Sequence, residues 1–319
     1  MQATPDADTT EALIVEYRAL CADAARHSAE GWSASPVEAW KDSALVTPRA
    51  LANFRCSPLS GGTQNWPDRP QDRAGDADGL YAPRSAGEAE AAAHALALGV
   101  REFGARLPSE LHEVYQRLAL DDDRCGGRPV EVPGLGPVTE SSIRFAYYGV
   151  LLGELVHDGD TVLEIGAGFG GTCSRLLQRR RDIRYVITDL PLNLLLAAHF
   201  LGGRLGARVR RVWTEDALAA ADGRVLLVAP WLVERLAGPV HLAVNTMSFQ
   251  HMTRRNLEYY GALLATLGTK MLYMVNRVGR RDPTDVPLAE YPFLPQYRPA
   301  MDRPFGERWR ELLLLAARG

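Results

Sequence analysis

The sequence predicts an α/β fold: a mostly parallel sheet with helices on both faces, preceded by a mainly helical N-terminal cap. Two observations carry this prediction. From residue 140 onward, apolar strand-like runs alternate with amphipathic stretches, which is typical of a parallel sheet covered by helices. Before that residue, helical periodicity dominates and strand signals are almost absent. The expected division is therefore residues 1–139 for the cap and 140–319 for the sheet domain.

The cap is expected to contain four helices and one extended arm. Between the second and third helices, Cys56 to Pro83 is rich in Gly, Pro, Asp and Ser and is too long for a simple connection, so a lid and a disordered segment both remain open. The Gly/Pro-rich stretch from Cys125 to Val138 predicts a short hairpin or arm. The expected helices are Glu11–His27, Pro36–Ala44, Ala86–Ala105 and Ser109–Leu120.

The sheet domain is expected to begin with a helix and then alternate between strands and helices. The apolar segment from Leu312 to Ala317 predicts a closing helix or strand packed on the sheet, or a contact in a homodimer. The expected strands are Thr161–Ile165, Tyr185–Thr188, Val209–Trp213, Leu242–Asn245 and Met271–Asn276. The expected helices are Ser141–Val156, Gly171–Arg180, Leu192–Leu201, Trp231–Leu236 and Arg254–Leu267.

Composition excludes several kinds of partner. The net charge of −3 gives no electrostatic support for binding nucleic acid. The four cysteines are scattered and Asp121 to Asp123 lacks histidines at ligand spacing, so no metal site is expected. The N-terminus is polar and acidic, and no uncharged stretch is long enough to span a membrane. The sequence therefore predicts a cytoplasmic protein that acts on a small molecule.

One segment has the pattern of a nucleotide-binding turn. Val162 to Gly171 is an apolar strand that ends in glycines and opens a helix, whose free N–H groups suit an anion. In a dinucleotide enzyme this anion is pyrophosphate, and in a methyltransferase it is the carboxylate of the donor's methionine moiety. The glycines satisfy GxGxxG and Asp189 follows at the distance of a ribose-binding acid, so spacing alone does not decide between NAD and another nucleotide.

The residues around this turn resemble a particular class of enzymes. Glu164 stands two places before the first glycine, and EIGAGFGG resembles the first motif of class I S-adenosylmethionine (SAM)-dependent methyltransferases, which have a Rossmann-like sheet. The segments VLEIGAGFGG, ITDLP, VAPWLVERL, LAVNTMSFQHM and MLYMVNR resemble, in this order, a bacterial family described as sugar O-methyltransferases. The resemblance covers about Arg144 to Arg277 and implies methylation of a hydroxyl on a sugar or a glycosylated secondary metabolite.

This resemblance also implies roles for individual residues. Asp189 would bind the ribose hydroxyls, and the segment from Asn245 to His251 would border the transferring methyl group. The position of His251 is usually glutamate in the family, so its role is not inherited; an imidazole can nevertheless accept a hydroxyl proton, and His251 is the first candidate for general base. The implied cofactor-binding residues are Glu164, Gly166, Ala167, Gly168, Gly170, Asp189, Leu190, Thr246 and Ser248.

The acceptor is the least defined part of the prediction. Tyr147 and Tyr148 are adjacent on the helix before the first strand and point about 100° apart, so at most one is expected to face a pocket. The other candidate acceptor contacts are Gln250, Asn276 and Arg144. Three alternatives remain open: methylation of carbon or nitrogen, a non-methylating reaction with the same cofactor, and a binding protein with a relic site.

Overall fold

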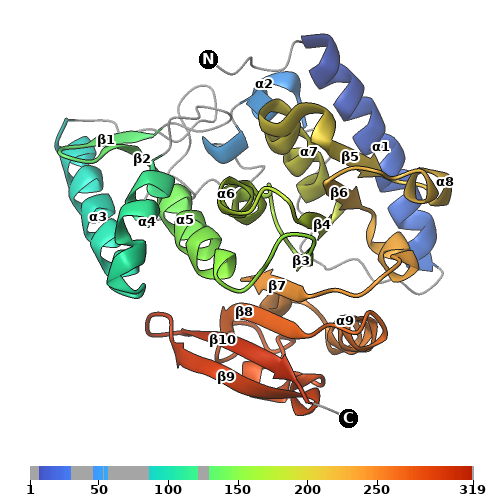
Figure 1. The fold of residues 1–319 in the computed structure, drawn as a ribbon. Coiled ribbons are helices and arrows are strands. Elements are labelled where there is room, and N and C mark those ends of the chain that lie inside the picture. The colour runs from blue at the N-terminus through green and yellow to red at the C-terminus, as the bar shows by residue number, and fades with distance from the viewer. Residues whose placement is uncertain (1–6, 30–45, 53, 57–85, 121–128, 318–319) are drawn as a thin grey trace.

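The computed structural model describes residues 7–29, 46–52, 54–56, 86–120 and 129–317 (Figure 1). The expected helix Pro36–Ala44, residues 57–83 of the long loop and the run Asp121–Asp123 therefore lie outside the described residues.

An eight-stranded sheet forms the centre of the molecule, in the order β5-β6-β4-β3-β7-β8-β10-β9. The strands from β5 to β8 in this order are parallel, whereas β10 runs antiparallel to both β8 and β9. The strands are β3 (Thr161–Ile165), β4 (Arg184–Thr188), β5 (Val209–Val212), β6 (Val225–Val228), β7 (Leu242–Thr246), β8 (Met271–Arg277), β9 (Tyr297–Pro304) and β10 (Trp309–Ala316).

The five expected strands are confirmed as β3, β4, β5, β7 and β8, and the closing segment predicted at Leu312–Ala317 as a helix or a strand is part of the strand β10. The sheet contains two more strands, β6 and β9. Strand β6 was not expected, and it lies between β4 and β5. It is a run of four buried apolar residues, too short for periodicity to separate it from a buried helical turn. Strand β9 was missed because it contains Pro299 and Pro304 and is largely exposed, so it lacks the apolar pattern of a strand. Prolines and exposed residues are both common in a strand at the edge of a sheet.

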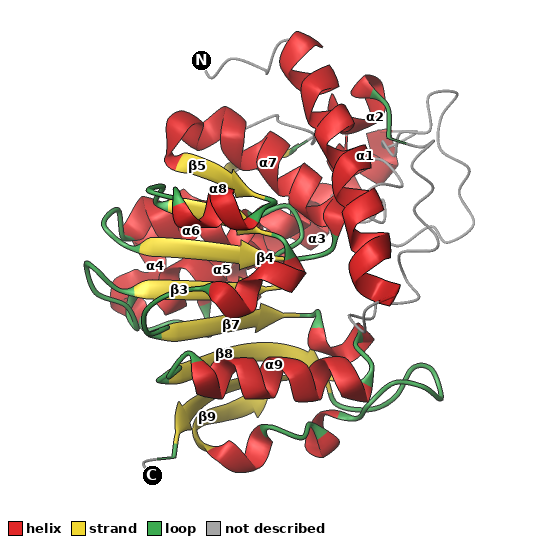
Figure 2. Cartoon of the chain, turned by 90° about the vertical axis from the view of Figure 1, so that its right-hand side faces the viewer, coloured by secondary structure: helices red, strands yellow, loops and turns green. Residues whose placement is uncertain are grey.

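Helices cover both faces of the sheet, which confirms the predicted fold class. Figure 2 shows α5 and α6 behind the sheet and α8 and α9 in front of it. The expected helix Trp231–Leu236 is instead a 3-10 helix, η7. The helices of this part are α5 (Glu140–Gly153), α6 (Gly171–Arg179), α7 (Pro191–Leu205), α8 (Glu215–Ala219) and α9 (Arg254–Thr266), with 3-10 helices η6 (Gly206–Arg208), η7 (Pro230–Arg235), η8 (Phe249–His251), η9 (Leu288–Glu290) and η10 (Leu294–Gln296).

The N-terminal elements pack directly on the sheet domain. Helix α1 contacts α7, and α3 and α4 contact α5. One continuous buried cluster runs from Leu13 in α1 to Leu314 in β10. The predicted helices at 11–27, 86–105 and 109–120 and the hairpin are confirmed, although residues 109–111 form a 3-10 turn. These elements are α1 (Ala7–Ala29), α2 (Pro48–Ala52), η3 (Phe54–Cys56), α3 (Ala86–Gly104), η5 (Ser109–Leu111), α4 (His112–Ala119), β1 (Val130–Val132) and β2 (Gly136–Val138).

Candidate active site

The glycine-rich turn lies at the carboxyl end of β3, where open parallel sheets bind their ligands. Gly166, Gly168 and Gly170 have φ angles of +77°, +58° and +84°, a region that residues with a side chain rarely adopt. At Gly166 a Cβ atom would also lie 1.9 Å from Oγ of Ser248, so the loop after β7 closes against the turn. Glycine at this position is therefore required by both conformation and space.

Glu164 lies beneath the turn and is completely buried. Its Oε2 accepts a hydrogen bond of 2.8 Å from the hydroxyl of Tyr185 on the neighbouring strand β4. Burial raises the pKa of Glu164 to about 7, and the bond from Tyr185 opposes part of that rise. The carboxyl group is therefore placed to hold β3 and β4 together under the turn, and its expected contact with a cofactor stays a prediction.

Asp189 connects the glycine turn to the start of α7. Its carboxylate accepts the backbone N–H of Gly168 at 2.7 Å, the N–H of Leu190 at 2.7 Å and Nδ2 of Asn193 at 2.9 Å. The structure thus brings Asp189 and the glycine turn into direct contact.

The loop after β7 holds a strained residue beside this turn. Met247 has φ of +62° and is the one non-glycine residue with positive φ in the described parts of the chain. Buried amides fix the loop on both sides: Nδ2 of Asn245 donates to the carbonyl of Ile165 at 2.7 Å, and its Oδ1 accepts Nδ2 of Asn276 at 3.0 Å. Backbone strain held by such a network is common at ligand sites.

Asn276 uses both ends of its amide within the protein. Its Nδ2 binds Asn245, and its Oδ1 accepts the backbone N–H of Gln250 at 3.3 Å. The side chain is completely buried, which favours a role in shaping the loop. Its expected contact with an acceptor stays a prediction.

The donors and acceptors around Gln250 define the tautomer of His251. The backbone N–H of Arg277 donates to Oε1 of Gln250 at 3.0 Å, which leaves Nε2 of Gln250 facing Nε2 of His251 at 3.0 Å. Because an amide NH₂ only donates, Nε2 of His251 must accept, and the ring proton must be on Nδ1. Although much of the residue is exposed, partial burial of the ring and then the charge of Arg277 lower the pKa of His251. The imidazole is therefore neutral at pH 7.

Tyr147 and Tyr148, of which at most one was expected to face a pocket, are both fully buried. The hydroxyl of Tyr147 donates to Oε1 of Glu311 at 2.5 Å. Tyr148 packs its ring against Phe305. Arg144 forms an ion pair of 3.3 Å with Glu140 in its own helix. Burial favours structural roles for the two tyrosines, and an acceptor contact of any of the three residues stays a prediction.

Tyr147 belongs to a buried charged cluster that the sequence did not reveal. We call it the Glu311 cluster: Glu311, Arg106, Arg303, Tyr147 and Tyr273. Oε2 of Glu311 accepts from Arg106 and Arg303 at 2.8 Å each, and Oε1 accepts from both tyrosine hydroxyls. Burial alone would raise the pKa of Glu311, but these hydrogen bonds lower it. The cluster joins the end of α3 to β8, β9 and β10.

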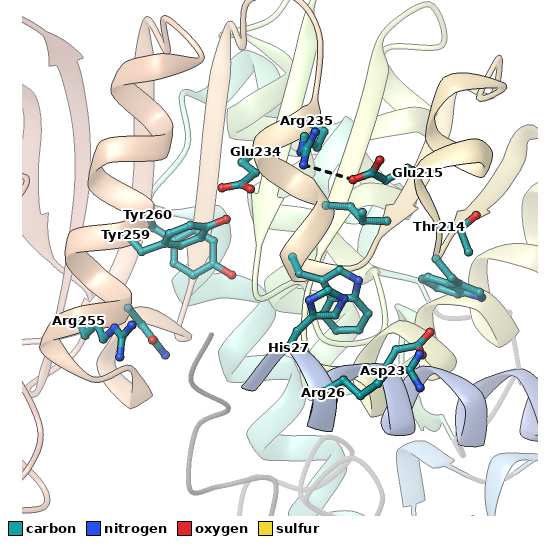
Figure 3. A pocket seen from close by; sticks show the side chains of 14 residues that line it. Asp23, Arg26, His27, Thr214, Glu215, Glu234, Arg235, Arg255, Tyr259 and Tyr260 are labelled. Carbon is teal, nitrogen blue, oxygen red and sulfur yellow. Dashed lines mark hydrogen bonds and ion pairs between the residues drawn. The ribbon is translucent and has the colours of Figure 1, made fainter. Parts of the chain in front are cut away.

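A pocket of about 620 Å³ opens beside the candidate site, in the volume range of small-molecule sites (Figure 3). Four segments far apart in sequence form it: the end of α1, the residues after β5, η7 and the first half of α9. The imidazole of His27 stacks on Trp231 with ring centroids 4.9 Å apart. The lining residues are Asp23, Arg26, His27, Trp213, Thr214, Glu215, Trp231, Leu232, Glu234, Arg235, Arg255, Asn256, Tyr259 and Tyr260.

Tyr260 lies between this pocket and the loop after β7, because it lines the pocket and packs near Phe249 of that loop. The two ring centroids are 6.2 Å apart. Burial, then Tyr259, then the carboxylate of Asp189 raise the pKa of the Tyr260 hydroxyl. None of the predicted cofactor residues lines the pocket. Sequence reasoning missed it because α1 lies about 200 residues from the other walls.

The described residues contain no group of three or more His, Cys, Asp or Glu side chains arranged to hold a metal ion. None of the helices in the described ranges is both long enough and apolar enough to cross a bilayer.

Comparisons with known proteins gave only distant structural similarity. No protein-family model matches the chain, and no curated protein does. The pyocyanin biosynthetic protein PhzM is 12% identical with a TM-score of 0.41, over 56% of this chain and 56% of PhzM. Magnesium protoporphyrin IX methyltransferase (ChlM) from Synechocystis PCC 6803, solved with bound SAH, is 13% identical with a TM-score of 0.41, over 56% of this chain and 83% of ChlM.

A further similar structure is an O-methyltransferase family protein from Burkholderia thailandensis, 15% identical with a TM-score of 0.37, over 56% of this chain and 61% of that protein. The chain therefore aligns with little more than half the length of PhzM. At these identities and TM-scores the similarities do not by themselves assign an activity.

Proposed function

We propose that this chain is a SAM-dependent methyltransferase that methylates a hydroxyl oxygen of a small molecule, with a sugar or glycosylated metabolite as the preferred acceptor. One observation carries the proposal: the glycine turn, Asp189 and the strained loop after β7 meet at one point. The N–H of Gly168 binds Asp189, and Ser248 closes on Gly166. These are the segments whose sequences resemble the methyltransferase motifs.

The chain's own groups fit such a donor. Backbone N–H groups at the N-terminus of α6 would bind a carboxylate, because a helix N-terminus favours anions. The N–H groups of Gly166, Gly168 and Gly170 already donate within the protein and shape the turn. Asp189 would accept hydrogen bonds from ribose hydroxyls through its carboxylate oxygens. When bound, SAM supplies an electrophilic methyl group on a sulfonium sulfur.

His251 is the proposed general base. A hydroxyl oxygen that received the donor's methyl group would have to lose its proton to the protein or to solvent. A neutral imidazole with its lone pair on Nε2 can accept that proton, and the lowered pKa of His251 keeps the ring neutral at pH 7. In the structure Gln250 occupies this lone pair, so the acceptor hydroxyl would have to take the place of the Gln250 amide.

Calorimetric titration with SAM, S-adenosylhomocysteine and NADH in parallel tests the cofactor. Micromolar binding of the first two and none of NADH is the expected result; binding of NADH alone would make the chain an oxidoreductase. Product analysis by mass and NMR then separates methylation of oxygen from methylation of carbon or nitrogen. A non-methylating reaction would proceed equally well with S-adenosylhomocysteine.

The role of His251 requires its own variant. In His251→Ala we expect kcat to fall by about 10²–10⁴-fold while SAM affinity is retained, because general-base catalysis contributes on that order. The matched control is His157→Ala, in the turn that follows α5. Wild-type turnover in His251→Ala would remove the base assignment.

A further inference from the structure

We infer that the pocket between α1, η7 and α9 binds the acceptor, and that it selects a neutral, hydroxylated ring over charged relatives of the same ring. The inference deepens the proposed function and rests on it for the identification of the ligand as the acceptor. It makes α1, and not only the sheet, part of the substrate site.

The position of the pocket is the first argument. Helix α1 lies on the side toward which the parallel strands point, and residues that follow β5 and β6 form the opposite wall (Figure 2). The proposed donor residues do not line the pocket. Tyr260 links the pocket to the loop after β7, because it lines the pocket and its ring lies 6.2 Å from that of Phe249, between centroids. Phe249 belongs to η8, the same short helix that carries His251.

The charge of the lining is the second argument. The described lining residues include three carboxylates, Asp23, Glu215 and Glu234, and three guanidinium groups, Arg26, Arg235 and Arg255. Two ion pairs, Asp23 with Arg26 and Glu215 with Arg235, lie inside this set (Figure 3). A ligand with a net charge of either sign would meet as many like charges as opposite ones. Hydroxyl groups, in contrast, both donate to carboxylates and accept from guanidinium groups.

The aromatic lining is the third argument. Trp213, Trp231, Tyr259 and Tyr260 surround the polar groups, and His27 stacks on Trp231. Large flat side chains offer apolar contact area with few rotatable bonds, and the tyrosine hydroxyl and indole N–H add polar tips. Flat apolar faces next to matched donors and acceptors suit a ring that has apolar faces and a hydroxylated rim.

The test is a ligand-observed NMR titration of the full chain, saturated with S-adenosylhomocysteine, with three forms of one ring: a methyl glycoside, the corresponding methyl uronate and the corresponding amino-sugar glycoside. We expect the neutral glycoside to bind about tenfold more tightly than either charged form, because attraction and repulsion by the lining balance for a charged ring, which still loses hydration on entering the pocket.

Glu234→Lys should change the charge preference without unfolding the protein, because Glu234 is exposed. It gives the lining an excess of positive charge, so the uronate should become the tightest of the three ligands. Glu307→Lys, in the exposed turn between β9 and β10, makes the same change of charge outside the pocket and should leave the order unaltered.

Three results would overturn the inference: equal or tighter binding of a charged form by the wild type, no binding of any of the three, or identical behaviour of the two lysine variants. Competition between the glycoside and S-adenosylhomocysteine would also overturn it, because the pocket would then hold part of the donor. If S-adenosylhomocysteine does not bind at all, the proposed function fails, whereas charge selection among the glycosides can still be measured on the unsaturated protein.

Discussion

Two regions of this molecule hold buried polar side chains at the sheet, and they differ in how those side chains are satisfied. In the Glu311 cluster, both carboxylate oxygens are fully engaged by two arginines and two tyrosines, and no backbone strain accompanies them. At the glycine turn, the carboxylate of Asp189 binds backbone N–H groups and an amide, Met247 is strained and His251 is exposed. Buried polar groups therefore point to a ligand site here where backbone strain and an exposed titratable side chain accompany them.

Glu311→Gln should produce the largest effect and should act on stability. Removing the charge leaves Arg106 and Arg303 without their shared carboxylate, and breaking a buried ion pair from one side costs about 3–5 kcal/mol. Urea unfolding measures the loss, with exposed Glu307→Gln as control. At temperatures where the variant is folded, its affinity for SAM should equal that of the wild type. A loss of SAM binding without a loss of stability would contradict the assignment of the Glu311 cluster to stability alone.

The lowered pKa of Glu311 also predicts how the stability of the protein depends on pH. Because the pKa of Glu311 is lowered in the folded protein, its stabilisation is present above the pKa of glutamate in the unfolded chain, about 4.3, and is lost as pH falls through the folded value. The stability difference between wild type and Glu311→Gln should therefore shrink below about pH 4. A difference that grows on acidification would contradict the sign of this shift.

Asp189→Ala should act on binding. Loss of hydrogen bonds from a charged acceptor to the ribose hydroxyls should weaken SAM binding by about 2–4 kcal/mol, measured by calorimetry. Because Asp189 also binds Gly168 and Asn193, Asp189→Asn is the companion variant that keeps the shape of the side chain. Unchanged affinity in both variants would remove the assignment.

Gly166→Ala tests the contact between the turn and the loop after β7. The new methyl group would meet Ser248, and the φ of +77° adds strain, so we expect a loss of about 2–3 kcal/mol in thermal or urea unfolding. Gly168→Ala has similar strain but nothing within 4 Å of its Cβ and should cost about 1 kcal/mol. Ser248→Gly should recover part of the Gly166→Ala loss; without recovery, the contact is not the cause.

Gln250→Glu should produce the smallest effect and should act on His251 alone. A carboxylate beside Nε2 favours protonation there, so the pKa of His251 should rise by about one unit, and the acid limb of the pH–rate profile should move to higher pH. Nitrogen-15 NMR of the imidazole reports the tautomer directly: the wild type should carry its proton on Nδ1 at neutral pH. A wild-type spectrum with the proton on Nε2 would contradict the Gln250 geometry, whatever the activity.

Much of the fold follows from local patterns. Alternating apolar runs and amphipathic helices predicted the parallel strands, since burial on both faces leaves a continuous apolar stretch. The glycine turn was predictable because positive φ angles and a following helix are properties of a few consecutive residues. Strand β6 was not predictable, because four consecutive apolar residues show no periodicity that separates a strand from a helix. Its position between β4 and β5 depends on the order of strands in the sheet, which the local sequence does not show.

The rest required the tertiary structure, because the contacts join residues that are far apart in the chain. Nothing local to Glu311 shows that Arg106 and Tyr147 will reach it, and that pairing engages the hydroxyl of Tyr147 inside the protein. Likewise, His27 becomes part of a pocket only when α1 reaches Trp231. The sequence therefore determined five of the six parallel strands and the glycine turn. Packing decided where β6 and β9 lie in the sheet and which polar groups bind one another, because those contacts join residues that are distant in the chain.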